Sequence, residues 1–149
     1  RSSDLVAADR PDQALGPVRE LLERNPGDPW ALEWRLRLAV AAGDEQVIED
    51  YLPRLLVLEP DHPFANVLLA GKHREQGELD LAESALRTAV ERSGDYRYRL
   101  LLADVLEAQG KTQAARRERA AAEAAGAAAD GEAGRSGRRS QPPSRATLV

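Results

Sequence analysis

The sequence contains no cysteine, which excludes disulfide bonds and thiolate metal sites from this chain. This absence suits a reducing compartment, and with no targeting signal visible the default expectation is a cytoplasmic protein. Long apolar runs are also missing, and no run approaches the ~18 to 20 residues that a membrane-spanning helix needs. We therefore expect no membrane span.

Acidic residues outnumber basic residues over most of the chain. The net charge is −4, yet residues 126–149 hold four arginines against two acids and so carry +2, which leaves −6 on residues 1–125. An acidic body argues against a nucleic-acid partner. Residues 126–149 are rich in Ala, Gly, Ser, Arg and Pro, and only Leu148 and Val149 are large aliphatic residues. Because such a composition cannot offset the entropy of ordering, we predict a disordered tail over these residues.

Groupings of catalytic or metal-ligating residues are also missing. The chain has two histidines, His62 in a turn and His73 on a predicted helix, and neither has a second histidine at ligand spacing. The ordinary interpretation is a loop residue at a helix start for His62 and a packing residue for His73. No phosphate-binding loop and no Gly-x-Ser-x-Gly motif occurs. We therefore expect no enzyme activity, no metal and no cofactor.

What the sequence does contain is a repeat with a period of 34 residues. The stretch NPGDPW at residues 25–30 recurs as EPDHPF at residues 59–64, with both prolines in the same places. At this spacing Gly43 aligns with Gly77 and, after a deletion of one residue, with Gly110. A fixed period of this length is typical of repeat proteins.

Each repeat divides into two helical stretches. The stretch over residues 44–60 carries an apolar stripe at i, i+3 and i+4 spacing, formed by Val47, Ile48, Tyr51, Leu52, Leu55 and Leu56. Glycine is a natural helix stop, so Gly43 is expected to end the preceding helix. At the joint between repeats, Asp28 is placed to cap the next helix, with Pro29 at its first position and His62 in the equivalent capping place. Neither helix can bury its stripe alone, so successive pairs are expected to stack.

These residues resemble the tetratricopeptide repeat (TPR) family. The third repeat matches its pattern best, through Leu69, Ala70, Gly77, Ala82, Leu86 and Ala89. The resemblance implies an all-α fold, an α-solenoid of antiparallel helix pairs over residues 1–125, with the disordered tail after it. The expected units are a partial repeat over 1–26 and full repeats over 27–60, 61–94 and 95–125. Three positions depart from the pattern: Ile48 stands where alanine is usual, Arg35 where leucine is usual, and Arg119 where a large apolar residue is usual.

The first repeat is incomplete, because residues 1–8 hold only the end of a first helix. The helix that follows carries apolar residues that include Ala14, Val18 and Leu21, and its neighbour is mostly missing. We expect the native protein to continue upstream of Arg1. The alternative is that Leu5 and Val6 suffice as a cap.

The resemblance further implies that the first helices of the pairs line a concave groove in which partner segments lie. Of the six aromatic residues, all but Tyr51 fall in the opening turns of these helices. Aromatic and arginine side chains make good anchors. The candidate partner-binding residues are therefore Trp30, Trp34, Arg37, Phe64, Arg74 and Arg97. The alternative for Trp30 and Phe64 is that they seal the junction between neighbouring repeats.

Two functions remain open from the sequence. The leading hypothesis is a non-catalytic interaction scaffold that holds a peptide or a partner protein in the groove. The alternative is the C-terminal appendage of a longer enzyme or redox protein whose active domain lies upstream of residue 1. The final Thr147-Leu148-Val149 also resembles a C-terminal ligand of a PDZ domain.

Overall fold

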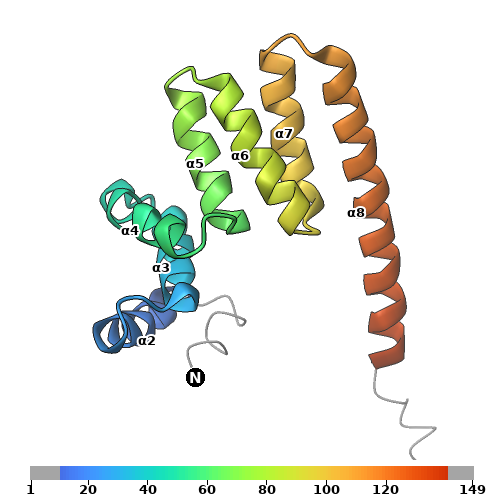
Figure 1. Ribbon diagram of the computed structural model, residues 1–149. Helices are drawn as coiled ribbons and strands as arrows, with labels where there is room; N and C mark the ends of the chain where they lie inside the picture. Colours follow the sequence, from blue (N-terminus) through green and yellow to red (C-terminus); the bar gives the residue numbers. More distant parts are fainter. Residues whose placement is uncertain (1–10, 141–149) are drawn as a thin grey trace, which may run out of the picture. The chain divides into compact units, whose positions relative to one another are not determined.

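Every regular element over residues 11–140, the part of the chain that the computed structural model describes, is an α-helix (Figure 1). In order they are α2 (Pro11–Arg24), α3 (Pro29–Ala42), α4 (Glu45–Leu58), α5 (Pro63–Glu75), α6 (Leu79–Arg92), α7 (Tyr96–Ala108) and α8 (Thr112–Ser140). Side chains are described from residue 13 to residue 131. The helix end expected over residues 1–8 and the terminal Thr147–Val149 lie outside the described residues. The chain divides after Gly94 into two compact units, one with α2 to α6 and one with α7 and α8.

The helices that open a repeat begin at equivalent residues. Asp28 caps α3, and its Oδ1 accepts hydrogen bonds from the backbone N–H groups of Trp30 at 2.9 Å and Ala31 at 3.3 Å. His62 caps α5 and Asp95 caps α7 in the same way. These bonds satisfy N–H groups that have no partner within the helix. Asp28 and His62 therefore have the capping places that the repeat indicated.

Glycine ends the same helices in the left-handed conformation. The φ angles are +70° at Gly43, +79° at Gly77 and +81° at Gly110. After α3 the N–H of Gly43 bonds to the carbonyl of Val40, and the N–H of Asp44 bonds to that of Ala39. Only glycine adopts such φ values without strain. The three aligned glycines, Gly43, Gly77 and Gly110, therefore predicted the sharp turns between paired helices.

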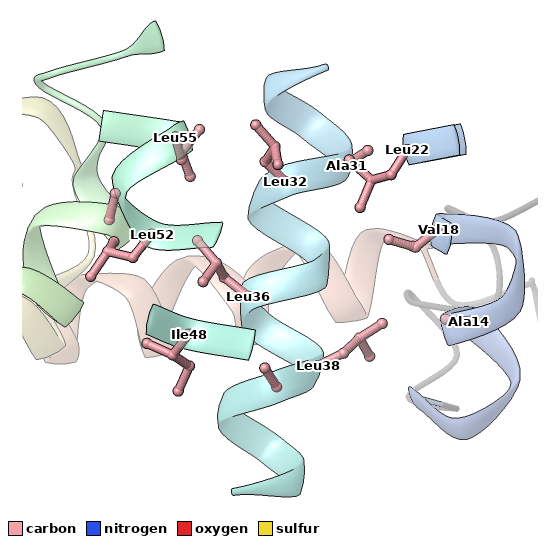
Figure 2. Close-up of a cluster of buried hydrophobic side chains, with 12 residues drawn as sticks. Ala14, Val18, Leu22, Ala31, Leu32, Leu36, Leu38, Ile48, Leu52 and Leu55 are labelled. Carbon is pink, nitrogen blue, oxygen red and sulfur yellow. The ribbon is translucent and has the colours of Figure 1, made fainter. Parts of the chain in front are cut away.

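In the first unit the core is built around α3, which lies between α2 and α4 (Figure 2). Leu32 and Leu36 lie on its side towards α4, whereas Ala31 and Leu38 lie towards α2. The buried residues of α4 are Ile48, Leu52 and Leu55, which belong to the stripe expected from the sequence. Helix α5 packs against α6 and also contacts α4. Each fully buried leucine contributes about 1.5–3 kcal/mol to stability, so no helix of this unit is stable without its neighbours.

In the second unit α7 packs against α8. Helix α7 buries Leu102, Ala103, Val105 and Leu106, and α8 buries Ala115 and Ala122. Arg119, which replaces a large apolar residue of the repeat pattern, donates to Asp104 at 3.2 Å and to Glu107 at 2.6 Å, both on α7. An ion-pair network thus stands where other repeats bury a side chain.

Helix α8 differs from the sequence prediction in its length. The tail was predicted to begin at residue 126, whereas α8 runs past Gly126 to Ser140, so the difference concerns where the tail begins. Two features explain the extension: the alanines around Gly126 are strong helix formers, and Gly126 is buried beside the ring of Tyr96. A Cβ at residue 126 would lie 3.4 Å from that ring, which is an ordinary van der Waals distance, so the ring lies directly against this part of α8. Residues 141–149 lie outside the described residues.

A membrane crossing needs a helix that is both long and apolar. None of the helices within residues 11–140 meets both conditions.

The glycine column gives a direct test of the turn geometry. Gly77→Ala is expected to lower the free energy of unfolding by about 1–2 kcal/mol, because alanine is strained at a φ of +79°. Gly71→Ala is the matched control, since Gly71 lies inside α5 with no atom within 4 Å of an added Cβ. This control should raise stability by about 0.5–1 kcal/mol. Urea unfolding measures both, and equal effects of the two substitutions would contradict the assigned turn.

Candidate functional site

Helix α3 presents Trp30, Trp34 and Arg37 on one side, because spacings of four and three residues place side chains on the same helix face. The two indole rings are in contact, with centroids 6.3 Å apart and planes inclined by 56°. Trp30, at the first turn, is 38% exposed. The opening turns of α3 therefore expose aromatic surface to solvent.

Arg37 connects this surface to the next repeat. Its guanidinium carbon lies 5.5 Å from the Trp34 ring centroid and 4.1 Å from that of Phe64, which belongs to α5. Both contacts are within the range of cation–π attraction. Trp30, Trp34, Arg37 and Phe64 therefore form one continuous patch, which we call the aromatic–arginine surface. Four of the six residues predicted to bind a partner lie together in it.

The other two predicted residues have different surroundings. Arg74 is exposed near the end of α5, about 15 Å along the helix from Phe64 at 1.5 Å per residue. Arg97 belongs to the second unit, where its Nε and Nη2 atoms bind the Asp95 carboxylate, the shortest contact being 2.6 Å. The hydrogen bond to Asp95 raises the pKa of the Arg97 guanidinium. The structure therefore does not place Arg74 in the aromatic–arginine surface, and Arg97 is held by its own capping residue.

A buried histidine is linked to this surface by hydrogen bonds. His62 is 8% exposed, and its Nδ1 accepts a hydrogen bond from the N–H of Ala65 at 3.2 Å. Since Nδ1 is the acceptor, the proton of the neutral ring lies on Nε2, which donates to Oε1 of Glu33 at 2.8 Å. Glu33 in turn accepts from Nε of Arg37 through its other oxygen, also at 2.8 Å. One carboxylate thus links the cap of α5 to the arginine of the surface.

The charge state of Glu33 follows from these contacts. The hydrogen bond from His62 lowers the pKa of Glu33 below its ordinary value of 4.5, and the bond and charge of Arg37 act in the same direction, while burial opposes them. The carboxylate is therefore ionised at neutral pH and accepts from both partners. The sequence indicated the capping place of His62 but not this bond, because Glu33 lies 29 residues away.

The second histidine has no comparable role. Nδ1 of His73 lies 3.5 Å from Oε1 of Glu78, which is too long for a good hydrogen bond. Over the described residues, no group of three or more His, Cys, Asp or Glu side chains is placed to hold a metal ion. The aromatic–arginine surface offers aromatic rings for stacking and the guanidinium N–H groups of Arg37 for hydrogen bonding.

The Glu33 contacts predict a pH-dependent effect of one substitution. Since the pKa of Glu33 is lowered on folding, its stabilisation is complete above pH 4.5 and is lost as the pH falls through the folded-state pKa. Glu33→Gln should therefore lower the free energy of unfolding at pH 7 by about 1–2 kcal/mol. The loss should shrink towards pH 3, as measured by urea unfolding at both pH values. An equal loss at the two values would contradict an ionised Glu33 at this joint.

Comparison with known proteins supports the fold alone. No protein-family model matches the chain, and a search of curated proteins finds no match. Among solved structures, the type IV pilus biogenesis factor PilW superposes with a TM-score of 0.68 at 14% identity over 83% of this chain. The chain spans 58% of the length of PilW. A structure of MamA gives a TM-score of 0.64 at 16% identity, covering 87% of this chain and 76% of MamA. Both neighbours are TPR-type proteins, and the chain has a TPR-like fold of paired helices.

Proposed function

We propose that the chain is a non-catalytic scaffold that binds a peptide or a segment of a partner protein at the aromatic–arginine surface, in the groove of the first helices α3 and α5. The observation that carries this proposal is the position of Arg37. Its guanidinium is held between the rings of Trp34 and Phe64, yet its side chain stays 35% exposed. Tetratricopeptide and related repeat arrays offer extended concave surfaces for binding, so the fold supports the proposal.

The surface has the composition of a binding hot spot. Tryptophan and arginine are enriched among residues that dominate interface energies. Arg37 is already fixed by Glu33 and by two rings, so its binding to a partner sacrifices little side-chain entropy. Glu33 is fixed in turn by His62, so the network arranges the surface before a partner arrives.

The same contacts indicate the chemistry of the segment that fits. Among the described residues, Arg37 donates a hydrogen bond only through Nε, which leaves its Nη groups for a carbonyl or carboxylate oxygen of a partner. Beside it, the exposed edge of Trp30 and the ring of Trp34 offer stacking partners for an apolar or aromatic side chain. The segment that we expect thus carries an apolar anchor next to an oxygen acceptor.

Tryptophan fluorescence tests this proposal directly. The chain has two tryptophans and both lie in the aromatic–arginine surface, so intrinsic fluorescence reports occupancy there. Peptides are selected from a random library on the immobilised protein, and their affinity is measured by fluorescence and calorimetry. Binding should change the emission of the unaltered protein. Trp34→Ala with Arg37→Ala should weaken binding at least about tenfold, because both are expected hot spots.

The matched control is Arg87→Ala on α6. Arg87 pairs with Glu83 at 2.8 Å through the same atoms and the same spacing as Arg37 with Glu33, but it lies away from the aromatic–arginine surface. It should leave peptide affinity unchanged. Circular dichroism confirms that each variant is folded. Undiminished binding by the folded double variant would overturn the proposal and favour a role for these residues in sealing the repeat junction alone.

A further inference from the structure

Arg35 is a buried arginine without a charged partner. It lies on α3 at the position where the following repeats have Leu69 and Leu102. Its side chain is 6% exposed, and within the described part of the chain its guanidinium forms no ion pair and no hydrogen bond. Buried charges are normally paired, because removing them from water is strongly unfavourable. The guanidinium nitrogens of Arg35 keep some contact with solvent, which reduces that penalty, but leucine would fill this place with no penalty at all.

Part of the penalty is offset by an aromatic ring. The guanidinium carbon of Arg35 lies 5.9 Å from the ring centroid of Tyr51 on α4, and that of Arg54 lies 4.8 Å from the same ring. Cation–π contacts attract a cation but accept no conventional hydrogen bond. The N–H donors of Arg35 therefore remain available.

Arg35 lines a cavity of about 280 Å³ formed by α2, α3 and Asp44, the residue that caps α4. Most of the wall is aliphatic and includes Leu15 and Leu38, and the charged residues on it are Arg35, Arg19 and Asp44. Asp44 is already engaged, because its Oδ1 caps α4 by accepting from the N–H of Val47 at 3.3 Å. The arginines are thus the groups of this cavity that offer donors to a ligand.

A second cavity, of about 480 Å³, shares Arg19 with the first. Tyr51, Arg54 and Glu23 also line it. Together the two cavities follow the space between α2 and α4, with three arginines against two carboxylates along it. No residue of the aromatic–arginine surface lines either cavity, so this site is separate from the one proposed above.

We propose that the smaller cavity binds a carboxylate carried on a short aliphatic body. The carboxylate would accept hydrogen bonds from Arg35, with Arg19 as a second donor, and the aliphatic part would lie against Leu15 and Leu38. A guanidinium presents paired donors that match the two oxygens of a carboxylate. The aliphatic wall disfavours phosphate, which is polar on every side, and the volume lies at the low end of ligand sites. The same chemistry occurs in a free aliphatic acid and in a glutamate side chain of a peptide.

The test uses the full chain and defined probes. Butyrate is titrated while NMR follows the Arg Nε–H signals and the leucine methyl signals, with butyramide and inorganic phosphate as comparison probes. A blocked Leu-Glu-Leu peptide and its Leu-Gln-Leu counterpart form the second arm. We expect saturable shifts at Arg35 and Leu38 and a rise in Tm with butyrate or with the glutamate peptide, and none with butyramide or the glutamine peptide. Whichever of the two carboxylate probes binds more tightly identifies the source.

Three variants make the test specific. Arg35→Leu restores the leucine of the neighbouring repeats and should raise the Tm of the unliganded protein, while carboxylate affinity falls at least about tenfold. Arg35→Gln replaces it as the test variant if the leucine variant does not fold. The same loss of carboxylate affinity is expected. Arg87→Leu, at an exposed position of α6, should bind as the unaltered protein does.

The proposal is overturned if folded Arg35→Leu or Arg35→Gln keeps the carboxylate affinity of the unaltered protein. It is also overturned if butyramide or phosphate binds as well as butyrate, or if neither carboxylate probe gives saturable shifts.

Discussion

Each helix of this chain has an apolar stripe that only neighbouring helices can cover, and the rest of the structure depends on this constraint. In the first unit α3 is buried on both sides, by α2 and by α4, and α5 contacts α4 as well as its own partner α6. Such packing requires the chain to reverse direction at fixed intervals. The recurring caps and the left-handed glycines provide those reversals, which is why the sequence repeats its turn residues more faithfully than its surface residues.

Positions that are equivalent in the repeat nevertheless carry different residues and make different contacts. The cap of a first helix is aspartate in α3 and α7 but histidine in α5, where His62 both caps the helix and donates to Glu33 of the preceding repeat. Arg35 lies in the same repeat as Glu33, at a position where leucine is usual. Its buried guanidinium places hydrogen-bond donors in the wall of a mostly aliphatic cavity. Both exchanges occur in the first unit, one on α3 and the other at the cap of α5.

The sequence predicted those features that depend on local chemistry. Helix starts at Asp28 and His62 and stops at Gly43 and Gly77 follow from side-chain capping and from backbone sterics, and the structure has them. The grouping of Trp30, Trp34 and Arg37 follows from helical spacing. The contact of Arg37 with Phe64 could not be predicted from helical spacing, because it depends on how two repeats pack against each other.

Other features required the structure because they depend on contacts between distant residues. The bond between His62 and Glu33 leaves no local pattern in the sequence, because the two residues are 29 positions apart. The contact between Gly126 of α8 and the Tyr96 ring joins residues that are far apart in the sequence, and composition does not reveal it. The departure of Arg35 from the repeat pattern marked the position as unusual, but its cavity is formed between α2 and α3 and cannot be inferred from either helix alone.

The most direct test of partner binding by this scaffold is a crystal structure of the protein with a selected peptide bound. The predicted result is a peptide that crosses α3 and α5, with a side chain stacked on Trp30 or Trp34 and an oxygen within hydrogen-bond distance of an Nη atom of Arg37. A peptide bound elsewhere, with Trp34 and Arg37 untouched, would contradict the assignment of the aromatic–arginine surface as the binding site.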